Sequence, residues 1–322
     1  MAGNSESPSS EAFRLFSSSS DEKPNLGFGF FDSSETPRPS LPPCVEVLPS
    51  EVSSSVKYIV EPVSLDGLTL LKGRVSTREV FALSNSDLVP GKYEGGLKLW
   101  EGSLDLVKAL HSEVENGHLA FTGKRVLELG CGHGLPGIFA CLEGAATVHF
   151  QDFNAEVLRC LTIPNANANL PKNVQPSALN VTNYDTGTEV RFFAGDWSEI
   201  DKLLHTHDIE DDPTNPVSGY DIILMAETVY SISVLQNLYE LIKKCTSSPH
   251  GLVYMAAKKH YFGVGGGTRR FLSVVEKDGL MDFSMVAEVA DGSSNVREVF
   301  MTLMMELEEV PIGRLTNLKR LL

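Results

Sequence analysis

The chain has 322 residues, of which 42% are hydrophobic and 21% are charged, a balance typical of a globular protein with a sizeable core. It contains no apolar run of about 18 residues, which excludes a transmembrane span, and its first residues lack the basic and apolar regions of a secretory signal. The formal net charge of −15 at pH 7 disfavours general nucleic-acid binding; it fits a basic protein partner, although acidity can also serve solubility alone.

The N-terminal part is expected to contribute little to the core. Residues 1–50 hold serine clusters and many prolines, so we predict a disordered tail there. Two apolar runs, 56–60 and 68–71, then flank Asp66-Gly67, which predicts a hairpin within an N-terminal β appendage at 51–89. A helix ending near Glu115 should follow the segment 90–101.

The most informative stretch begins at Lys124. Residues 126–129 predict a short buried strand, a glycine-rich turn follows at 130–134, and helical spacing returns at Leu135. Such a strand, turn and helix N-terminus form a place where backbone can approach a ligand closely.

Two ligand classes fit this stretch. The spacing acid-x-Gly-x-Gly-x-Gly, starting at Glu128, is the pattern of class I S-adenosylmethionine (AdoMet) methyltransferases. Gly132, Gly134 and Gly137 also satisfy the dinucleotide pattern G-x-G-x-x-G. Both readings expect a ribose-binding acid after the next strand, where Asp152 stands, and a glycine turn without any ligand is the third possibility.

Strands and helices then alternate, which predicts an α/β fold with a mostly parallel sheet covered on both faces. Between the strands we expect irregular structure at 164–189 and a polar loop at 205–219. The expected strands are 126–129, 146–151, 190–194, 220–226, 251–256, 281–289 and 297–305, the last two antiparallel. Seven strands favour the Rossmann-like class I methyltransferase arrangement over the six-stranded dinucleotide one, with a domain at 90–310 and a C-terminal tail at 311–322.

Polar residues follow several of these strands, at the edge where open parallel sheets bind ligands. Asp152 can accept from both ribose hydroxyls, and Asp196 can accept from the adenine amino group while Trp197 packs on the ring. Ala226 and Glu227 would close the site where the methyl group is passed. Asp152 and Asp196 could instead only cap the helices that follow them.

Two longer runs are more specific than the glycine loop. With 93–101 (Tyr-Glu-Gly-Gly-Leu-Lys-Leu-Trp-Glu) and 260–267 (His-Tyr-Phe-Gly-Val-Gly-Gly-Gly), the chain resembles the eukaryotic protein-histidine N-methyltransferases. Their seven-strand family also holds many protein-lysine methyltransferases. Lysine-modifying relatives typically carry Asp-x-x-Tyr or Asp-x-x-Phe after the fourth strand, whereas this chain has Glu227-x-x-Tyr230, consistent with a different acceptor.

The resemblance implies AdoMet as cofactor and a histidine of a large-subunit ribosomal protein as acceptor. The histidines lack a second ligand at metal spacing, so no metal is expected. Glu227 is the candidate that accepts from the imidazole N–H, and Tyr230 would shape the pocket. The expected cofactor contacts are Trp100, Glu101, Glu128, Gly130, Cys131, Gly132, Gly134, Gln151, Asp152, Phe153, Gly195, Asp196, Trp197 and Ala226.

Three functions stay open at this stage: histidine methylation, lysine methylation by the same fold, and a non-catalytic AdoMet-fold module that binds a ribosomal protein during assembly. The glycine loop 263–267 would either let an acceptor chain approach closely or form a flexible connection. Five cysteines without metal-type spacing read as reduced thiols, so we expect a cytoplasmic and nuclear protein with no membrane contact and no direct nucleic-acid binding.

Overall fold

The computed structural model describes residues 41–83, 87–170, 182–183, 187–205, 219–247, 250–290 and 296–304. The chain divides into a unit of Met1–Pro39 and a unit of Ser40–Leu322, and every described residue belongs to the second. The predicted C-terminal tail, most of the predicted N-terminal tail and nearly all of the predicted polar loop lie outside the described residues. Within the described ranges no helix combines the length and the apolarity that a membrane span requires.

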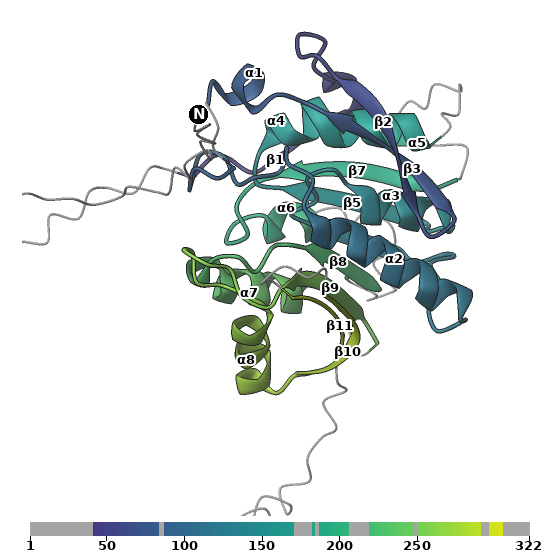
Figure 1. The fold of residues 1–322 in the computed structure, drawn as a ribbon, viewed down its shortest axis with the longest axis vertical. Coiled ribbons are helices and arrows are strands. Elements are labelled where there is room, and N and C mark those ends of the chain that lie inside the picture. The colour runs from purple at the N-terminus through teal and green to yellow at the C-terminus, as the bar shows by residue number, and fades with distance from the viewer. Residues whose placement is uncertain are drawn as a thin grey trace, which may run out of the picture. The chain divides into compact units, whose positions relative to one another are not determined.

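Across the described residues, nine strands form the main sheet, in the order β1-β7-β5-β4-β8-β9-β11-β10, with β6 also paired to β7 (Figure 1). The strands are β1 Val45–Glu46, β4 Arg125–Leu129, β5 Thr147–Asp152, β6 Thr182–Asn183, β7 Glu189–Ala194, β8 Ile222–Ala226, β9 Leu252–Lys258, β10 Met281–Val289 and β11 Arg297–Met304. The five adjacent strands β7, β5, β4, β8 and β9 pair in parallel, and β11 runs antiparallel to its neighbours β9 and β10.

The seven longer strands agree with the predicted set and its antiparallel end. The predicted count of seven was too low because it omitted β1 and β6, which both pair with β7 at one edge. Each has only two residues, too few for a hydrophobic period to be read from sequence.

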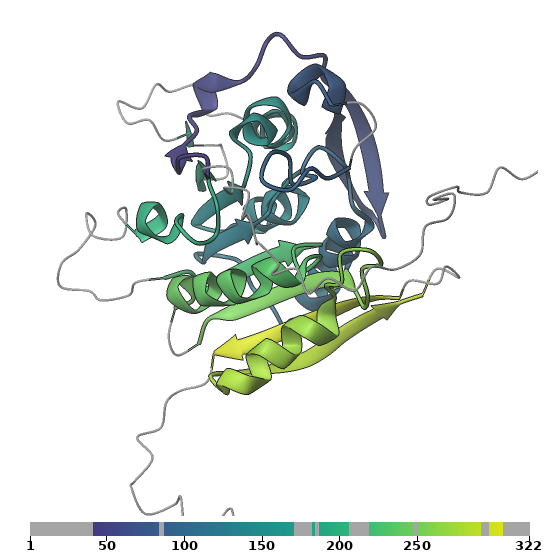
Figure 2. The ribbon, with the colours of Figure 1, turned by 90° about the vertical axis from the view of Figure 1, so that its left-hand side faces the viewer.

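Helices cover both faces of the sheet (Figure 2). On one face lie α2 Glu101–Glu115, α3 Leu135–Leu142 and α5 Ile163–Asn169, and on the other α6 Asp201–His205, α7 Leu235–Cys245 and α8 Thr268–Asp278. The spacing predicted a buried face of α2 with Leu104, Val107, Leu110 and Val114. Val107 and Leu110 are fully buried and the other two are partly buried, whereas the fully buried Leu106 was not predicted. The sheet therefore has one core cluster on each face. Because β4, β5, β7 and β8 are parallel, their carboxyl ends lie at the same end of the sheet.

The predicted hairpin is confirmed. Strands β2 Ile59–Leu65 and β3 Leu68–Arg74 pair antiparallel around Asp66 and Gly67, whose φ angles of 49° and 96° are both positive. Positive φ at both central residues is the geometry that matches the twist of paired strands.

The helix after β5 continues further than the sequence predicted. It runs as α4 Ala155–Val157, a π-helical turn at Leu158–Thr162, and α5 to Asn169. The prediction of irregular structure from Pro164 was therefore wrong for residues 164–169. The asparagines that suggested a loop instead hold the hairpin. Asn165 Oδ1 accepts from the Gly73 N–H at 2.6 Å, and Asn169 pairs with the Leu71 N–H and carbonyl at 2.7 and 2.6 Å.

The folded part also begins before the predicted boundary at residue 50. Val47 is buried, and its N–H donates to the Phe192 carbonyl at 2.8 Å. The Glu46 carboxylate receives two hydrogen bonds of 2.8 Å from Arg191. The prolines and polar residues around this segment concealed a short edge strand.

Candidate active site

The glycine loop after β4 is held by side chains at the end of β5. The Gly132 N–H donates to Asp152 Oδ2 at 3.0 Å, and the Gly130 N–H donates to Gln151 Oε1 at 3.3 Å. The Cys131 N–H donates to the Gln151 carbonyl at 2.8 Å. Consecutive residues of β5 therefore set the loop that the sequence singled out.

Asp152 is buried, with 4% of its surface exposed, and its second oxygen accepts from the Asn154 N–H at 3.0 Å. Burial raises the pKa of Asp152 to about 6, because the two backbone donors only partly compensate the loss of water. The carboxylate thus supports the glycine loop but does not cap α4, whose N-cap is Asn154 and which has no side-chain capping bond. It also retains acceptor capacity that ribose hydroxyls could use.

The segment before α2 lies against this loop. A Cβ added to Gly132 would lie 2.9 Å from the Gly96 carbonyl oxygen, so the two backbones approach as closely as glycine permits. Asn154 holds the segment, because its side chain accepts from the Glu94 N–H at 3.2 Å and donates to the Lys92 carbonyl at 2.9 Å.

Glu128 and Gly134 connect β4 to α3. The Glu128 side chain is 2% exposed, and its Oε2 accepts from the Gly137 N–H at 2.8 Å. Gly134 is the N-cap of α3, with φ 70°. Glu128 therefore fastens the helix to the strand, and its direct contact with a cofactor stays a prediction.

Gln151 connects the loops that follow β4 and β7. Its side chain is fully buried, its Oε1 accepts from Trp197 Nε1 at 2.9 Å, and its Nε2 donates to the Gly195 carbonyl at 2.9 Å. Asp196 Oδ1 accepts from the Ser198 N–H and hydroxyl at 2.9 and 2.6 Å, so this carboxylate stabilises the turn before α6, which begins at Asp201. The half-buried Trp197 ring faces the loop, since its Cζ2 is 3.6 Å from a Cβ placed on Gly130.

The residues present fit AdoMet. Thr228 Oγ1 is buried and has no hydrogen-bond partner among the described residues, and Thr228 Cγ2 is 2.8 Å from a Cβ placed on Gly130. A hydroxyl left unpaired beside a glycine cradle marks a place that a polar ligand could complete. Asp152 supplies a buried acceptor and Trp197 an aromatic surface. Ala226, half-buried at the end of β8, and Phe153, half-buried after Asp152, lie at the same edge.

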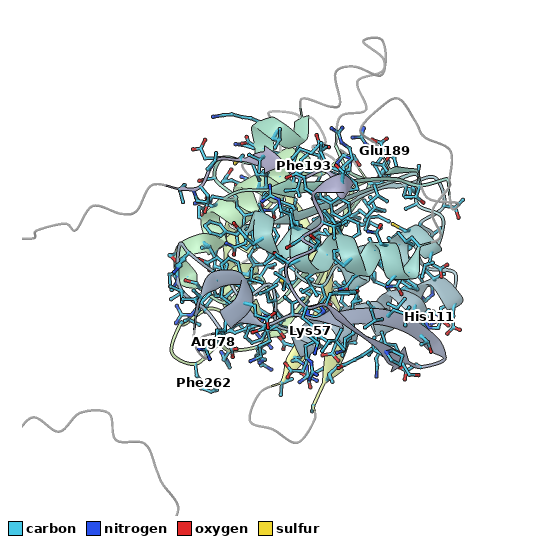
Figure 3. The ribbon with its side chains drawn as sticks, turned by 90° about the horizontal axis from the view of Figure 1, so that it is seen from above. Lys57, Arg78, His111, Glu189, Phe193 and Phe262 are labelled. Carbon is cyan, nitrogen blue, oxygen red and sulfur yellow. The ribbon has the colours of Figure 1, made fainter. Side chains whose placement is uncertain are left out.

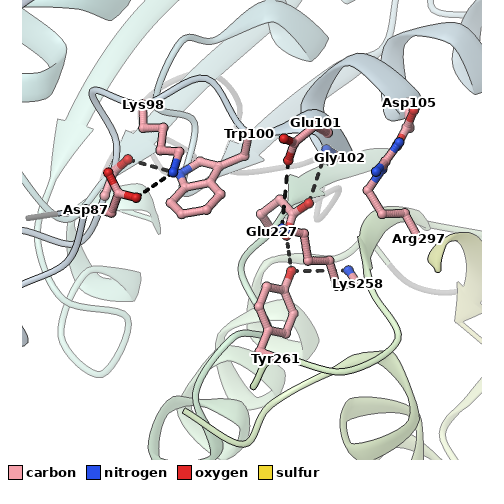
Figure 4. Close-up of polar contacts among 11 residues, drawn as sticks. Asp87, Lys98, Trp100, Glu101, Gly102, Asp105, Glu227, Lys258, Tyr261 and Arg297 are labelled. Carbon is pink, nitrogen blue, oxygen red and sulfur yellow. Dashed lines mark hydrogen bonds and ion pairs between the residues drawn. The ribbon is translucent and has the colours of Figure 1, made fainter. Parts of the chain in front are cut away.

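Glu227 occupies a strained position directly after β8 (Figure 4). Its φ is 58°, in the left-handed region that non-glycine residues avoid and that persists where function or packing requires it. Oε1 accepts from the Gly102 N–H at 3.1 Å, and Oε2 accepts from the Tyr261 hydroxyl. Burial raises the pKa of Glu227, while Tyr261 and Lys258 oppose the rise.

Trp100 and Glu101 lie at the start of α2, next to Gly102. Trp100 donates its Nε1–H to the Gly95 carbonyl at 3.1 Å, and Lys98 Nζ lies 4.4 Å from the centre of its ring. The Glu101 carboxylate is 3.8 Å from Lys258 Nζ. Both residues are thus on the Glu227 side of the site, and their contact with a cofactor stays a prediction.

Tyr230 and Glu94 form a second tyrosine–carboxylate pair. The Tyr230 hydroxyl donates to Glu94 Oε2, and the other Glu94 oxygen accepts from the Gly91 N–H at 2.7 Å. Burial and the neighbouring carboxylate raise the pKa of Tyr230 well above its usual value, so the phenol stays protonated.

The glycine run after β9 is packed on the segment after β8, so it is not a loose connection. Gly266 and Gly267 donate their N–H groups to the Tyr230 and Val229 carbonyls, both at 2.9 Å. A Cβ on Gly266 would lie 2.2 Å from the Val229 carbonyl oxygen, so a side chain cannot be placed there. The run holds Tyr261, a residue that the sequence analysis did not single out, although it follows the carboxyl end of β9.

His133 and His149, both buried, serve packing. His133 Nε2 lies 3.3 Å from the Leu97 carbonyl, and burial lowers its pKa to about 4. His149 Nδ1 is 2.7 Å from the Tyr220 hydroxyl. Within the described ranges, no three His, Cys, Asp or Glu side chains gather in a way that could hold a metal ion.

Comparison with known proteins gives the family. A model of the lysine methyltransferase family matches residues 90–278, more than half of the chain. A mouse protein named histidine protein methyltransferase 1 homolog is 35% identical over 282 residues, which cover 79% of this chain and 73% of that protein. Its Dictyostelium discoideum namesake is 39% identical over 217 residues, covering 67% of this chain and 60% of that protein.

A mouse protein named EEF1A lysine methyltransferase 3 is less similar, at 29% identity over 161 residues, covering 50% of this chain and 55% of that protein. The strand order, the glycine loop and these matches agree on one conclusion. The protein belongs to the lysine methyltransferase family of AdoMet-dependent class I enzymes, in which it resembles the eukaryotic proteins named for histidine methylation.

Proposed function

We propose that this enzyme transfers a methyl group to a histidine side chain of a protein substrate. The observation that carries the proposal is the buried carboxylate of Glu227 at the carboxyl end of β8, between the first turn of α2 and Tyr261. The names of the mouse and Dictyostelium relatives support the same acceptor.

The chemistry asks little of the protein beyond alignment, exclusion of water and control of one proton. AdoMet supplies a methyl group that its sulfonium already activates. A neutral imidazole attacks through one nitrogen and carries an N–H on the other. Glu227 would accept from that N–H, which selects the tautomer and stabilises the positive charge that develops on the ring. Each Glu227 oxygen has one hydrogen bond from the protein, so the carboxylate retains lone pairs for this contact.

For the cofactor, we propose that Asp152 accepts from the ribose hydroxyls and that the loop 130–134 meets the amino-acid part. Trp197 would pack on the adenine, with Asp196 accepting from its amino group. The Asp196 side chain is half-exposed and uses Oδ1 on Ser198, so Oδ2 is the atom offered for this contact.

For the substrate, we propose a basic protein of the large ribosomal subunit. The resemblance to the protein-histidine methyltransferases suggests this class, and the net charge of −15 fits a basic partner. The same reasoning favours a cytoplasmic and nuclear enzyme that recognises protein and makes no direct contact with nucleic acid.

The test is to incubate the enzyme with labelled AdoMet and a large-subunit ribosomal protein fraction, and to locate the label by mass spectrometry. We expect methylhistidine in one protein, and labelling that is slower by about a hundredfold or more with Glu227→Gln. Label on lysine would support the lysine alternative, which the family description and the name of the mouse EEF1A lysine methyltransferase 3 favour. Binding of ribosomal protein without any transfer would support the non-catalytic module.

A further inference from the structure

Tyr261 shares the Glu227 carboxylate with the first turn of α2 (Figure 4). The N-cap of α2, Trp100, makes no side-chain capping bond, so the Gly102 N–H at this helix end is satisfied by Glu227 Oε1 instead. The other oxygen is held by the Tyr261 hydroxyl. Both Glu227 oxygens are therefore fixed by groups from separate segments of the chain.

The tyrosine is itself held firmly. Its hydroxyl accepts from the Lys258 N–H at 3.3 Å, and its carbonyl accepts from the Gly265 N–H at 2.9 Å. The next two glycines are bonded to the segment that carries Glu227 and Tyr230. Loop 261–267 thus places the Tyr261 hydroxyl against the Glu227 carboxylate, and its glycines fix the loop through backbone hydrogen bonds.

We propose that Tyr261 is a positioning residue of the acceptor site, whose hydroxyl keeps the Glu227 carboxylate ionised and oriented for the acceptor imidazole. This inference rests on the proposed role of Glu227. A hydroxyl that donates to a carboxylate favours its charged form, which is the form that can accept from an imidazole N–H.

Other groups around Glu227 act on its charge as well. Lys258 of β9 and the Gly102 N–H of α2 favour the ionised form, whereas burial and Glu101 of α2 oppose it. Lys258 and Glu101 lie 3.8 Å apart, so the lysine's charge is partly offset by its neighbour. Tyr261 donates directly to the Glu227 carboxylate, whereas the charge of Lys258 is shared between Glu227 and Glu101.

The test is a double-mutant cycle on single-turnover methyl transfer, with Tyr261→Phe, Glu227→Ala and the double variant. We expect Tyr261→Phe alone to lower the rate about tenfold and Glu227→Ala to lower it about a hundredfold. If the tyrosine acts through the carboxylate, the double variant should match Glu227→Ala. Rate losses that multiply to about a thousandfold would overturn the proposal.

Tyr254→Phe is the matched control. Tyr254 is a fully buried tyrosine of β9 whose hydroxyl has no hydrogen-bond partner among the described residues. Its loss of a hydroxyl should leave the rate unchanged. Thermal unfolding of each variant shows whether the fold is kept.

A second readout does not depend on activity. The pKa of Glu227, followed by NMR with ¹³C-labelled glutamate and assigned through Glu227→Gln, should rise in Tyr261→Phe and stay in place in Tyr254→Phe. An unchanged pKa in Tyr261→Phe would contradict the proposal even if the wild-type enzyme methylated no histidine. If the label is found on lysine while the double variant still matches Glu227→Ala, only the proposed histidine acceptor is wrong.

Discussion

The two sides of the site are built differently. On the donor side, formed by the loops after β4, β5 and β7, polar side chains bond mainly to backbone groups, as Asp152 does to Gly132 and Gln151 to Gly195. On the acceptor side, formed by the segments after β8 and β9 with the start of α2, side chains pair with each other, as Glu227 does with Tyr261 and Tyr230 with Glu94. The donor side is thus a backbone loop held by side chains, and the acceptor side is a set of paired side chains.

If the sides are this separate, one substitution should disable transfer and spare cofactor binding. Glu227→Gln should lower the single-turnover plateau by about a hundredfold or more, because a neutral amide stabilises the developing imidazolium less well. The affinity for AdoMet should change little. Rapid-quench kinetics and calorimetry on the same preparation measure both, and a parallel loss of affinity would show that the two sides are one unit.

The reverse experiment is Asp152→Ala, which should abolish tight AdoMet binding and preserve the fold. Losing hydrogen bonds to a charged acceptor costs about 1.5–3 kcal/mol, or roughly ten- to more than a hundredfold in affinity. Titration calorimetry provides the affinity, and the melting temperature provides the control. Wild-type affinity in the variant would refute the ribose assignment.

The donor side should also respond to pH where the acceptor chemistry is not involved. The pKa of Asp152 is raised from 3.8 to about 6, so the carboxyl is protonated below that pH and ionised above it. Ribose hydroxyls favour the ionised form, so affinity for S-adenosylhomocysteine should fall about tenfold between pH 7 and pH 5. Calorimetry in Asp152→Ala should show no such dependence, and a similar slope in that variant would assign the titration to another group.

The smallest effect is expected at the outer rim of the acceptor side. Phe262 is 75% exposed and lies at the periphery of the molecule, and Ile232 is 51% exposed (Figure 3). Exposed apolar residues beside a protein-acceptor site fit a docking contact. Phe262→Ser should raise KM for the protein substrate several-fold, by about 1 kcal/mol, at constant kcat. Met285→Ser, at another exposed site on β10, is the control.

What the sequence could predict depends on whether a feature follows from a local pattern or from tertiary contacts. The bounds of the seven longer strands, the hairpin turn at Asp66-Gly67 and the glycine loop follow from periodicity and local turn chemistry, so they were predicted nearly to the residue. The two-residue edge strands and the end of α5 were not, because they depend on partners far along the chain, as in the bonds of Asn165 and Asn169 to β3.

The site shows the same division. Asp152, Gln151 and the glycine loop come together as predicted, because the two side chains end β5 and the loop follows the neighbouring parallel strand β4. Tyr261 was missed because it stands three residues beyond the end of β9, in a run that reads as a glycine loop. The strand-end rule applied to β9, together with the glycine run after it, was the available signal.

The most direct test of the account asks which side chain receives the methyl group and how its transfer depends on pH. A histidine acceptor has an ordinary pKa of about 6.5, so the single-turnover rate should rise from about pH 5.5 and flatten near about pH 7 to 7.5, with the label on histidine. A lysine acceptor has a pKa of about 10.4, and its rate would keep rising about tenfold per unit to about pH 9. Such a rise, with the label recovered on lysine, would contradict histidine methylation.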